Sequence, residues 1–150
     1  MIIIGEKING AIPSIKQAIA ERNEALIIER TLAQAAAGAN FLDCAPSTAT
    51  EIEYETMVWL IGLMQGATNV PLCIDSPNAK LLARVIEEGH LNKPGMVNSV
   101  NEEGDKCETI FPLVAGTPWE VVGLTCDQEG IPADPAKKVD IAKRIIDKAV

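Results

Sequence analysis

Six polar side chains follow short apolar segments at intervals along the chain, and they could form a hydrogen-bonding site. They are Glu6, Asn9, Asp43, Asp75, Ser76 and Asn98. A carboxylate only accepts hydrogen bonds, in two places, whereas an amide both donates and accepts. Lys7 is the only cation near these segment ends. The set therefore suits a neutral heterocycle with adjacent N–H groups, such as a 2-aminopyrimidinone edge, and is unsuited to phosphate.

Several of these residues also have a purely structural interpretation. Asp, Ser and Asn often cap helices, so Asp75 or Ser76 could serve only as an N-cap, and Asn98 has the same ambiguity. The spacing of Ser99 and Glu102 even matches a capping box. Their joint placement at segment ends favours a shared site over a series of unrelated caps.

The elements that would position these residues alternate regularly. Short, apolar, non-alternating segments are typical of strands covered on both faces, and they are separated by helical segments. The predicted strands are residues 2–5, 40–44, 72–74, 95–98 and 121–124; the predicted helices are 12–21, 24–37, 51–66, 78–88, 104–115 and 134–150. This order predicts right-handed crossovers and a parallel α/β sheet.

Polar residues at the ends of nearly all strands favour a TIM (β/α)8 barrel, in which many loops build one site. A doubly wound sheet, the alternative, concentrates its site at one switch point, and no nucleotide-binding glycine motif is present. A closed barrel has eight units and about 250 residues. We therefore expect residues 1–150 to supply roughly the first five units, as the N-terminal portion of a barrel domain.

Composition narrows the classes of partner. The net charge of −8 argues against a nucleic-acid binder, and no apolar run approaches the ~20 residues of a membrane span. With no secretion signal, we expect a cytoplasmic protein with reduced cysteines. Cys44, Cys73 and Cys126 lie near strand ends, where a metal triad is conceivable, but burial as small apolar residues is favoured. His90 is expected to be a solvated loop residue.

Five segments, in order, carry a family resemblance: MIIIGEKING, LDCAP, LCIDSPN, MVNSVN and VVGLTCDQEGIP. Together they resemble the methyltetrahydrofolate-dependent methyltransferases that serve corrinoid proteins. The pterin-binding domains of methionine synthase and dihydropteroate synthase are more distant relatives. The resemblance runs over all 150 residues. Each piece is weak alone, but their order on predicted strand ends is fairly specific.

The resemblance implies a pterin-binding TIM barrel in which Asp75 and Asn98 bind the pterin edge. It implies that Glu6, Asn9 and Asp43 support the pocket floor, with Ser76 also among the substrate-binding residues. One position departs from the family pattern, because Ala45 stands where members commonly carry Asn. The groups that act near N5 belong in the family to the last three strands, so no catalytic residue is assigned here.

The resemblance further implies movement of the N5 methyl group of methyltetrahydrofolate to or from the cobalt of a corrinoid. That cobalamin-type cofactor would be carried by a partner protein, and the enzyme would be a homodimer. Two alternatives stay open. One is a non-catalytic pterin-binding or assembly module; the other is a dihydropteroate synthase-type enzyme, which would need a basic phosphate subsite. The pathway and the identity of the corrinoid partner are not specified by the sequence.

Overall fold

The computed structural model describes all residues from 1 to 150 and contains five strands and six helices. In chain order they are β1 (Ile4–Gly5), α1 (Pro13–Ala20), α2 (Glu24–Ala36), β2 (Phe41–Cys44), α3 (Thr50–Ala67), β3 (Leu72–Asp75), α4 (Ala79–Glu87), β4 (Met96–Val100), α5 (Lys106–Val114), β5 (Glu120–Gly123) and α6 (Pro135–Ala149). Each predicted strand and helix is present, with ends shifted by at most two residues.

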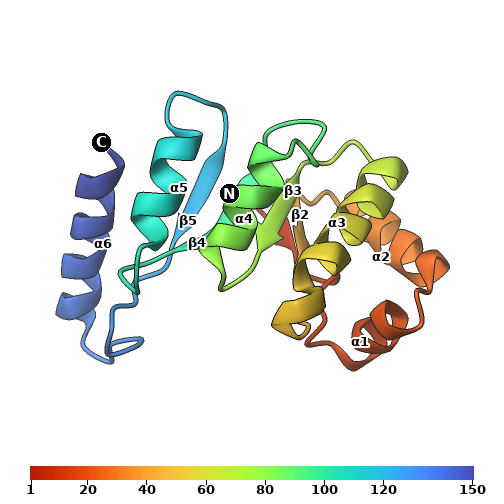
Figure 1. Cartoon of the computed structure of the whole chain (residues 1–150), viewed down its shortest axis with the longest axis horizontal. Coiled ribbons are helices and arrows are strands. Elements are labelled where there is room, and N and C mark those ends of the chain that lie inside the picture. The colour runs from red at the N-terminus through yellow and green to blue at the C-terminus, as the bar shows by residue number, and fades with distance from the viewer.

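The five strands form one parallel sheet in the order β1-β2-β3-β4-β5. The sheet is curled into a half-barrel. Successive helices from α2 to α6 contact one another in sequence, and Figure 1 shows them in a row from α1 and α2 at one end of the molecule to α6 at the other. A doubly wound sheet would reverse its strand order at a switch point, so the sequential order favours the barrel type.

The strands bury their two faces differently. Residues on one face, including Leu42, Ile74 and Val97, pack against the helices in the large hydrophobic core. The residues that alternate with these along the strands, Phe41 and Cys73 among them, form a small separate cluster on the concave face. Burial on both faces explains why these strands read as continuous apolar runs rather than alternating ones.

Helix ends follow local signals in the sequence. Asn23 caps α2 by accepting a hydrogen bond from the amide of Leu26, and Asn78 caps α4 through the amide of Leu81. Gly38 follows α2 with a φ of +86°, a conformation that glycine adopts without a Cβ penalty. The capping-box interpretation of Ser99 and Glu102 is wrong, because β4 continues through Val100 and α5 begins only at Lys106.

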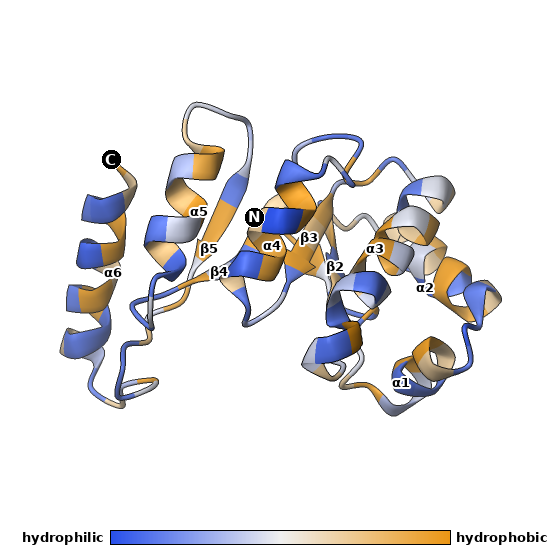
Figure 2. Cartoon of the chain, in the orientation of Figure 1, coloured by the Kyte–Doolittle hydropathy of each residue, from blue (hydrophilic) through white to orange (hydrophobic).

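Helix α6 shows how amphipathicity places the outer layer. Its Ile141 and Ile145 are buried, and Figure 2 shows its apolar residues gathered on the side facing α5, with hydrophilic residues on the other. No helix in the structure combines the length and the apolar character needed to cross a membrane.

Replacing Gly10 with alanine is expected to destabilise the fold by about 1–3 kcal/mol, the usual range for overpacking. The amide of Gly10 donates to the carbonyl of Ala45, 2.9 Å away, and an added methyl group would clash with the carbonyl oxygen of Pro46. Gly62→Ala is the matched control, since Gly62 lies in α3 with open space around it. That change should stabilise by roughly 0.5–1 kcal/mol. Urea unfolding of both variants tests the pair, and equal stabilities would contradict the close approach.

Candidate pterin-binding site

Three of the predicted site residues share the concave face of the half-barrel. Asp75 on β3 lies in register with Asn98 on β4, and Asp43 on β2 lies in register with Cys73, two residues before Asp75. Side chains two residues apart on a strand point to the same face. Asp43, Asp75 and Asn98 therefore lie together near the carboxyl ends of neighbouring strands, where barrel enzymes build their sites. We call these three residues the polar cluster.

An apolar layer lies beneath the polar cluster. Phe41, Cys73 and Met96 form a small buried group, with Ile4 and Val122 packed against it. Cys73 precedes Asp75 by two positions and Met96 precedes Asn98 by two, so each lies one step deeper on the same strand face. This layer lowers the local polarity, which strengthens electrostatic interactions among the groups above it.

Burial and repulsion raise the pKa of Asp43. The residue is 1% exposed, and its Oδ1 is buried without a hydrogen-bond partner. Desolvation first, and then the negative charges of Asp75 and Glu6, raise its pKa to about 7, while hydrogen bonding from Cys73 and Asn98 acts in the opposite direction. A carboxyl that carries a proton near neutral pH can donate a hydrogen bond as well as accept one.

Asp75 is free to bind a ligand because it caps no helix. The N-cap of α4 is Asn78, so the capping interpretation of Asp75 is wrong. Its pKa is raised by partial burial, and then by the charges of Glu6 and Glu53. A half-buried carboxylate near other acids gains most from a ligand that donates hydrogen bonds to it. Asn98, half-buried beside it, adds a group that both donates and accepts.

Ser76 faces away from the polar cluster. Its hydroxyl donates to Oε1 of the buried Glu53 at 2.6 Å and accepts the amide of Asn78 at 3.0 Å. The structure thus gives Ser76 a joining role between α3 and the start of α4. Since it directly follows Asp75 on the chain, it also fixes the end of β3.

Ser76→Ala is expected to lower the free energy of unfolding by about 1–2 kcal/mol, because it leaves the buried Glu53 carboxylate without its partner. Chemical denaturation at pH 7 measures the effect. The double variant Ser76→Ala with Glu53→Gln is the control: it removes the unpaired charge and should recover part of the loss. A single variant as stable as the original protein would show that the 2.6 Å bond contributes nothing.

Glu6 and Asn9 lie at the β1 end of the site in different ways. Glu6 is exposed, and its charge acts on both Asp43 and Asp75. The Oδ1 of Asn9 accepts hydrogen bonds from the amide of Ala11 and from the hydroxyl of Ser47. Asn9 therefore ties the loop after β1 to the loop after β2, which positions the edge of the site.

Other polar residues after the strands have structural partners. Asn101 is buried and bonds to Glu103, while Asp127 accepts the amide of Glu129 and pairs with Lys137 at 3.0 Å. His90 is also better packed than expected. It is not a solvated loop residue, because its side chain is 29% exposed and its Nε2 lies 2.8 Å from the hydroxyl of Tyr54.

The cysteines are buried free thiols, as favoured from the sequence. Burial raises the pKa of Cys44 and Cys73, and nearby Asp43 adds to the effect. No grouping of His, Cys, Asp and Glu side chains in the chain has the arrangement of a metal site.

Two contributors to the site were missed in the sequence. Glu53 lies in the first turn of α3 and is 6% exposed, yet its charge acts on Asp75; nothing in the local sequence marks it, since acids are common in a first helical turn. The position of Cys73 could have been predicted, because it precedes Asp75 by two positions on a strand and therefore lies on the same face of the sheet.

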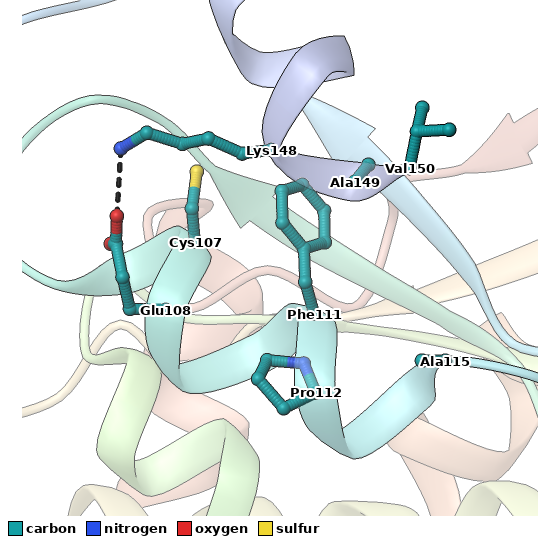
Figure 3. Close-up of a pocket in the computed structure, with 8 residues that line it drawn as sticks. All are labelled: Cys107, Glu108, Phe111, Pro112, Ala115, Lys148, Ala149 and Val150. Atoms are coloured by element: carbon teal, nitrogen blue, oxygen red, sulfur yellow. Dashed lines mark hydrogen bonds and ion pairs between the residues drawn. The ribbon is translucent and has the colours of Figure 1, made fainter.

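An apolar cavity lies elsewhere, between α5 and α6. It measures about 460 Å³ and is lined mainly by apolar residues such as Phe111, Pro112 and Val150. Figure 3 shows the residues that line it, with the Lys148–Glu108 ion pair at one edge. No member of the polar cluster lines it. The polar cluster instead lies on the open concave face of the sheet.

Comparison with known proteins gives relatives that match nearly the whole chain. A methylcorrinoid:tetrahydrofolate methyltransferase from Eubacterium limosum is 48% identical over 151 aligned positions, which cover 99% of this chain and 55% of that protein. Methionine synthases from Mycobacterium tuberculosis and Mycobacterium leprae are 30% and 29% identical over 97% of the chain, covering 13% and 12% of their own lengths. No protein-family profile matches the chain.

These similarities confirm the resemblance read from the five sequence segments. The chain is similar to a corrinoid- and folate-dependent methyltransferase throughout, and more distantly to methionine synthase. It spans about half the length of the methyltransferase, 55%.

Proposed function

We propose that the protein carrying this chain is a methyltransferase that acts between tetrahydrofolate and a corrinoid protein, and that residues 1–150 are the N-terminal part of its pterin-binding domain. The observation that carries the proposal is the 48% identity to the methylcorrinoid:tetrahydrofolate methyltransferase across 99% of the chain. The polar cluster supports it, because acceptors on a shared strand face match the N–H edge of a pterin.

The domain would be an eight-unit barrel. The edge strands of the half-barrel are β1 and β5, and strand edges present unpaired amide and carbonyl groups that need covering. Three further β/α units between β5 and β1 would pair both edges and close the sheet. The matched part of the methyltransferase, 55%, leaves room in that relative for such units.

Asp75 and Asn98 would bind the pterin directly. The Asp75 carboxylate accepts from the ring N–H and the exocyclic amine, and the Asn98 amide matches a neighbouring edge with both donor and acceptor character. Asp43 on the neighbouring strand and Glu6 at the β1 end of the site would contribute to the charge of the pocket. Asn9 and Ser76 act indirectly, by fixing the loop after β1 and the end of β3.

The name of the similar methyltransferase suggests transfer from a methylated corrinoid to tetrahydrofolate. In that direction the N5 lone pair attacks the methyl carbon, the cobalt–carbon bond breaks with its electrons remaining on cobalt, and N5 loses its proton. The reverse reaction breaks the carbon–N5 bond and returns a proton to N5. The role of this chain would be to hold the pterin so that N5 faces the corrinoid. Orienting the reactants in this way lowers the activation barrier.

Methyl transfer can be followed directly with the native full-length protein. Cob(I)alamin and methylcobalamin have different visible spectra, so we expect enzyme-dependent interconversion when methyltetrahydrofolate is mixed with cob(I)alamin, or tetrahydrofolate with methylcobalamin. Pterin binding without transfer in either direction would favour the non-catalytic module. Formation of dihydropteroate from p-aminobenzoate and a pterin diphosphate would favour a dihydropteroate synthase-type enzyme.

We further propose that the native protein is a cytoplasmic homodimer, as the resemblance implies. Light scattering coupled to size-exclusion chromatography of the full-length protein tests the dimer, and cell fractionation tests the location. A monomeric mass at micromolar concentration would contradict the first proposal.

A further inference from the structure

A second cavity lies between α1 and the N-terminal end of α3. It has a volume of about 410 Å³ and is lined by ten residues, of which two are basic and none is acidic. Figure 1 shows α1 at the same end of the molecule as the start of α3. A basic lining is unexpected in a chain with a net charge of −8, so the cavity differs in character from the polar cluster.

The two basic residues are Lys16 and Arg22, and neither side chain forms an ion pair. The guanidinium of Arg22 lies over the ring of Trp59, with its Cζ 4.5 Å from the ring centroid. A cation–π contact of this kind holds the group in place without neutralising its charge. Both cations therefore remain available to an anion.

Two hydroxyl groups in the cavity lining are unpartnered. Thr48 and Thr56 line the cavity, and the Oγ1 atom of each is buried without a hydrogen-bond partner. Thr56 is only 1% exposed, so folding removes its hydroxyl from water without giving it a hydrogen-bond partner in the protein. An unsatisfied buried donor lowers stability and calls for an explanation. A ligand oxygen in the cavity would supply the missing acceptor.

The start of α3 adds backbone donors. Its N-cap residue, Ala49, lines the cavity and has no side chain able to cap the first-turn amides. These amides carry the positive end of the helix dipole, which favours anions. The two acids of the first turn do not occupy the cavity: Glu51 is absent from its lining, and the carboxylate of Glu53 is bonded to Ser76.

The cavity is connected to the proposed pterin site through one residue. Ser47 lines the cavity, and its hydroxyl donates to Oδ1 of Asn9 at 3.2 Å. Asn9 belongs to the loop at the β1 end of the site. A ligand that extended from the concave face past this Ser47–Asn9 contact would reach a cavity lined by two basic residues and by two threonines with unpartnered hydroxyls.

We propose that this cavity binds the carboxylates of the folate glutamate tail, through Lys16, Arg22, the Thr56 hydroxyl and the amides at the start of α3. The proposal rests on the function proposed above, since it assumes that the pterin lies at the polar cluster. The shared ligand chemistry is that of an oxyanion, so a free anion such as inorganic phosphate is the competing source. Folates with several γ-linked glutamates would gain most.

Calorimetry with the native full-length protein distinguishes binding of the glutamate tail from binding of a free anion. The probes are a tail-less reduced pterin, methyltetrahydrofolate with one or three glutamates, the γ-linked triglutamate peptide alone, and inorganic phosphate. We expect the triglutamate form to bind about tenfold more tightly than the monoglutamate form. Lys16→Gln and Thr56→Val should each lower the affinity for the triglutamate form by about three- to fivefold. Tail-less pterin should bind all variants equally. Lys143→Gln, an exposed unpaired lysine on α6, is the charge-matched control.

Thr56 offers a readout that a structural role would not give. Thr56→Val keeps the side-chain shape and removes an unpartnered hydroxyl, so without ligand it should raise the melting temperature, while Thr56→Ser should retain tail binding. Equal affinity for one and three glutamates would overturn the proposal, as would phosphate binding without peptide binding. If tail-less pterin fails to bind while the peptide binds through Lys16, the proposed pterin function fails and the anion site stands.

Discussion

Asp75→Ala is expected to weaken methyltetrahydrofolate binding by about 3 kcal/mol, or roughly 100-fold, in the full-length protein. The carboxylate is placed to accept two hydrogen bonds from the pterin edge, and bonds to a charged acceptor contribute about 1.5–3 kcal/mol each. Asp75→Asn should do nearly as much harm, because its NH2 group would face ligand N–H donors. Isothermal titration calorimetry measures both variants directly.

The same change should leave the fold intact. Asp75 caps no helix, and its charge lies near those of Glu6 and Glu53. Removing it relieves repulsion, so the unfolding midpoint of Asp75→Ala should equal or exceed that of the original protein. Asp147→Asn, an exposed acid on α6, is the charge-matched control and should alter neither property. Unchanged folate affinity in Asp75→Ala would remove Asp75 from the site.

Local signals in the sequence were enough to predict the elements of this fold. Asn23 and Asn78 cap helices in the structure, and Gly38 ends one with a positive φ. The joint position of Asp75 and Asn98 was also predictable, because carboxyl ends of parallel strands meet at one edge of a sheet. Here the two residues lie in register on neighbouring strands.

Side-chain direction at strand ends was harder to predict. Ser76 and Asp75 are adjacent in sequence, yet only Asp75 lies on the concave face while Ser76 bonds to Glu53 in the helical layer. A one-residue step reverses the face, and nothing in LCIDSPN states where the strand stops. The partner of Ser76 lies 23 residues away, and such a long-range contact has no local signal.

The raised pKa of Asp43 could not be predicted from the sequence either. Asp43 follows the same strand-end pattern as Asp75, but only the structure shows that it is 1% exposed with one oxygen unpartnered. Its burial depends on β1, β2 and β3 together with the apolar layer beneath the polar cluster. An ordinary acid in the sequence thus becomes the member of the cluster that takes up a proton first.

Asp43→Asn is expected to become more stable than the original protein as the pH rises from about 4 to about 7, and to keep that advantage at higher pH. The folded-state pKa of Asp43 is raised from 3.8 to about 7, so its contribution to stability is fully present below pH 3.8 and is lost as the pH rises through 7. The loss at pH 8 is about 4 kcal/mol, since each pKa unit corresponds to about 1.4 kcal/mol. Asparagine stays neutral and avoids this loss.

Paired unfolding curves of the original protein and Asp43→Asn, at about pH 3.5 and pH 8, test this expectation. The two proteins should be similar at the lower pH, where Asp43 is largely protonated in both the folded and the unfolded state, and the variant should be more stable at pH 8. Asp147→Asn again serves as the charge-matched control, because Asp147 is an exposed acid on α6. A variant that loses stability equally at both pH values would show that Asp43 accepts an essential hydrogen bond, and that burial and repulsion do not dominate its ionisation.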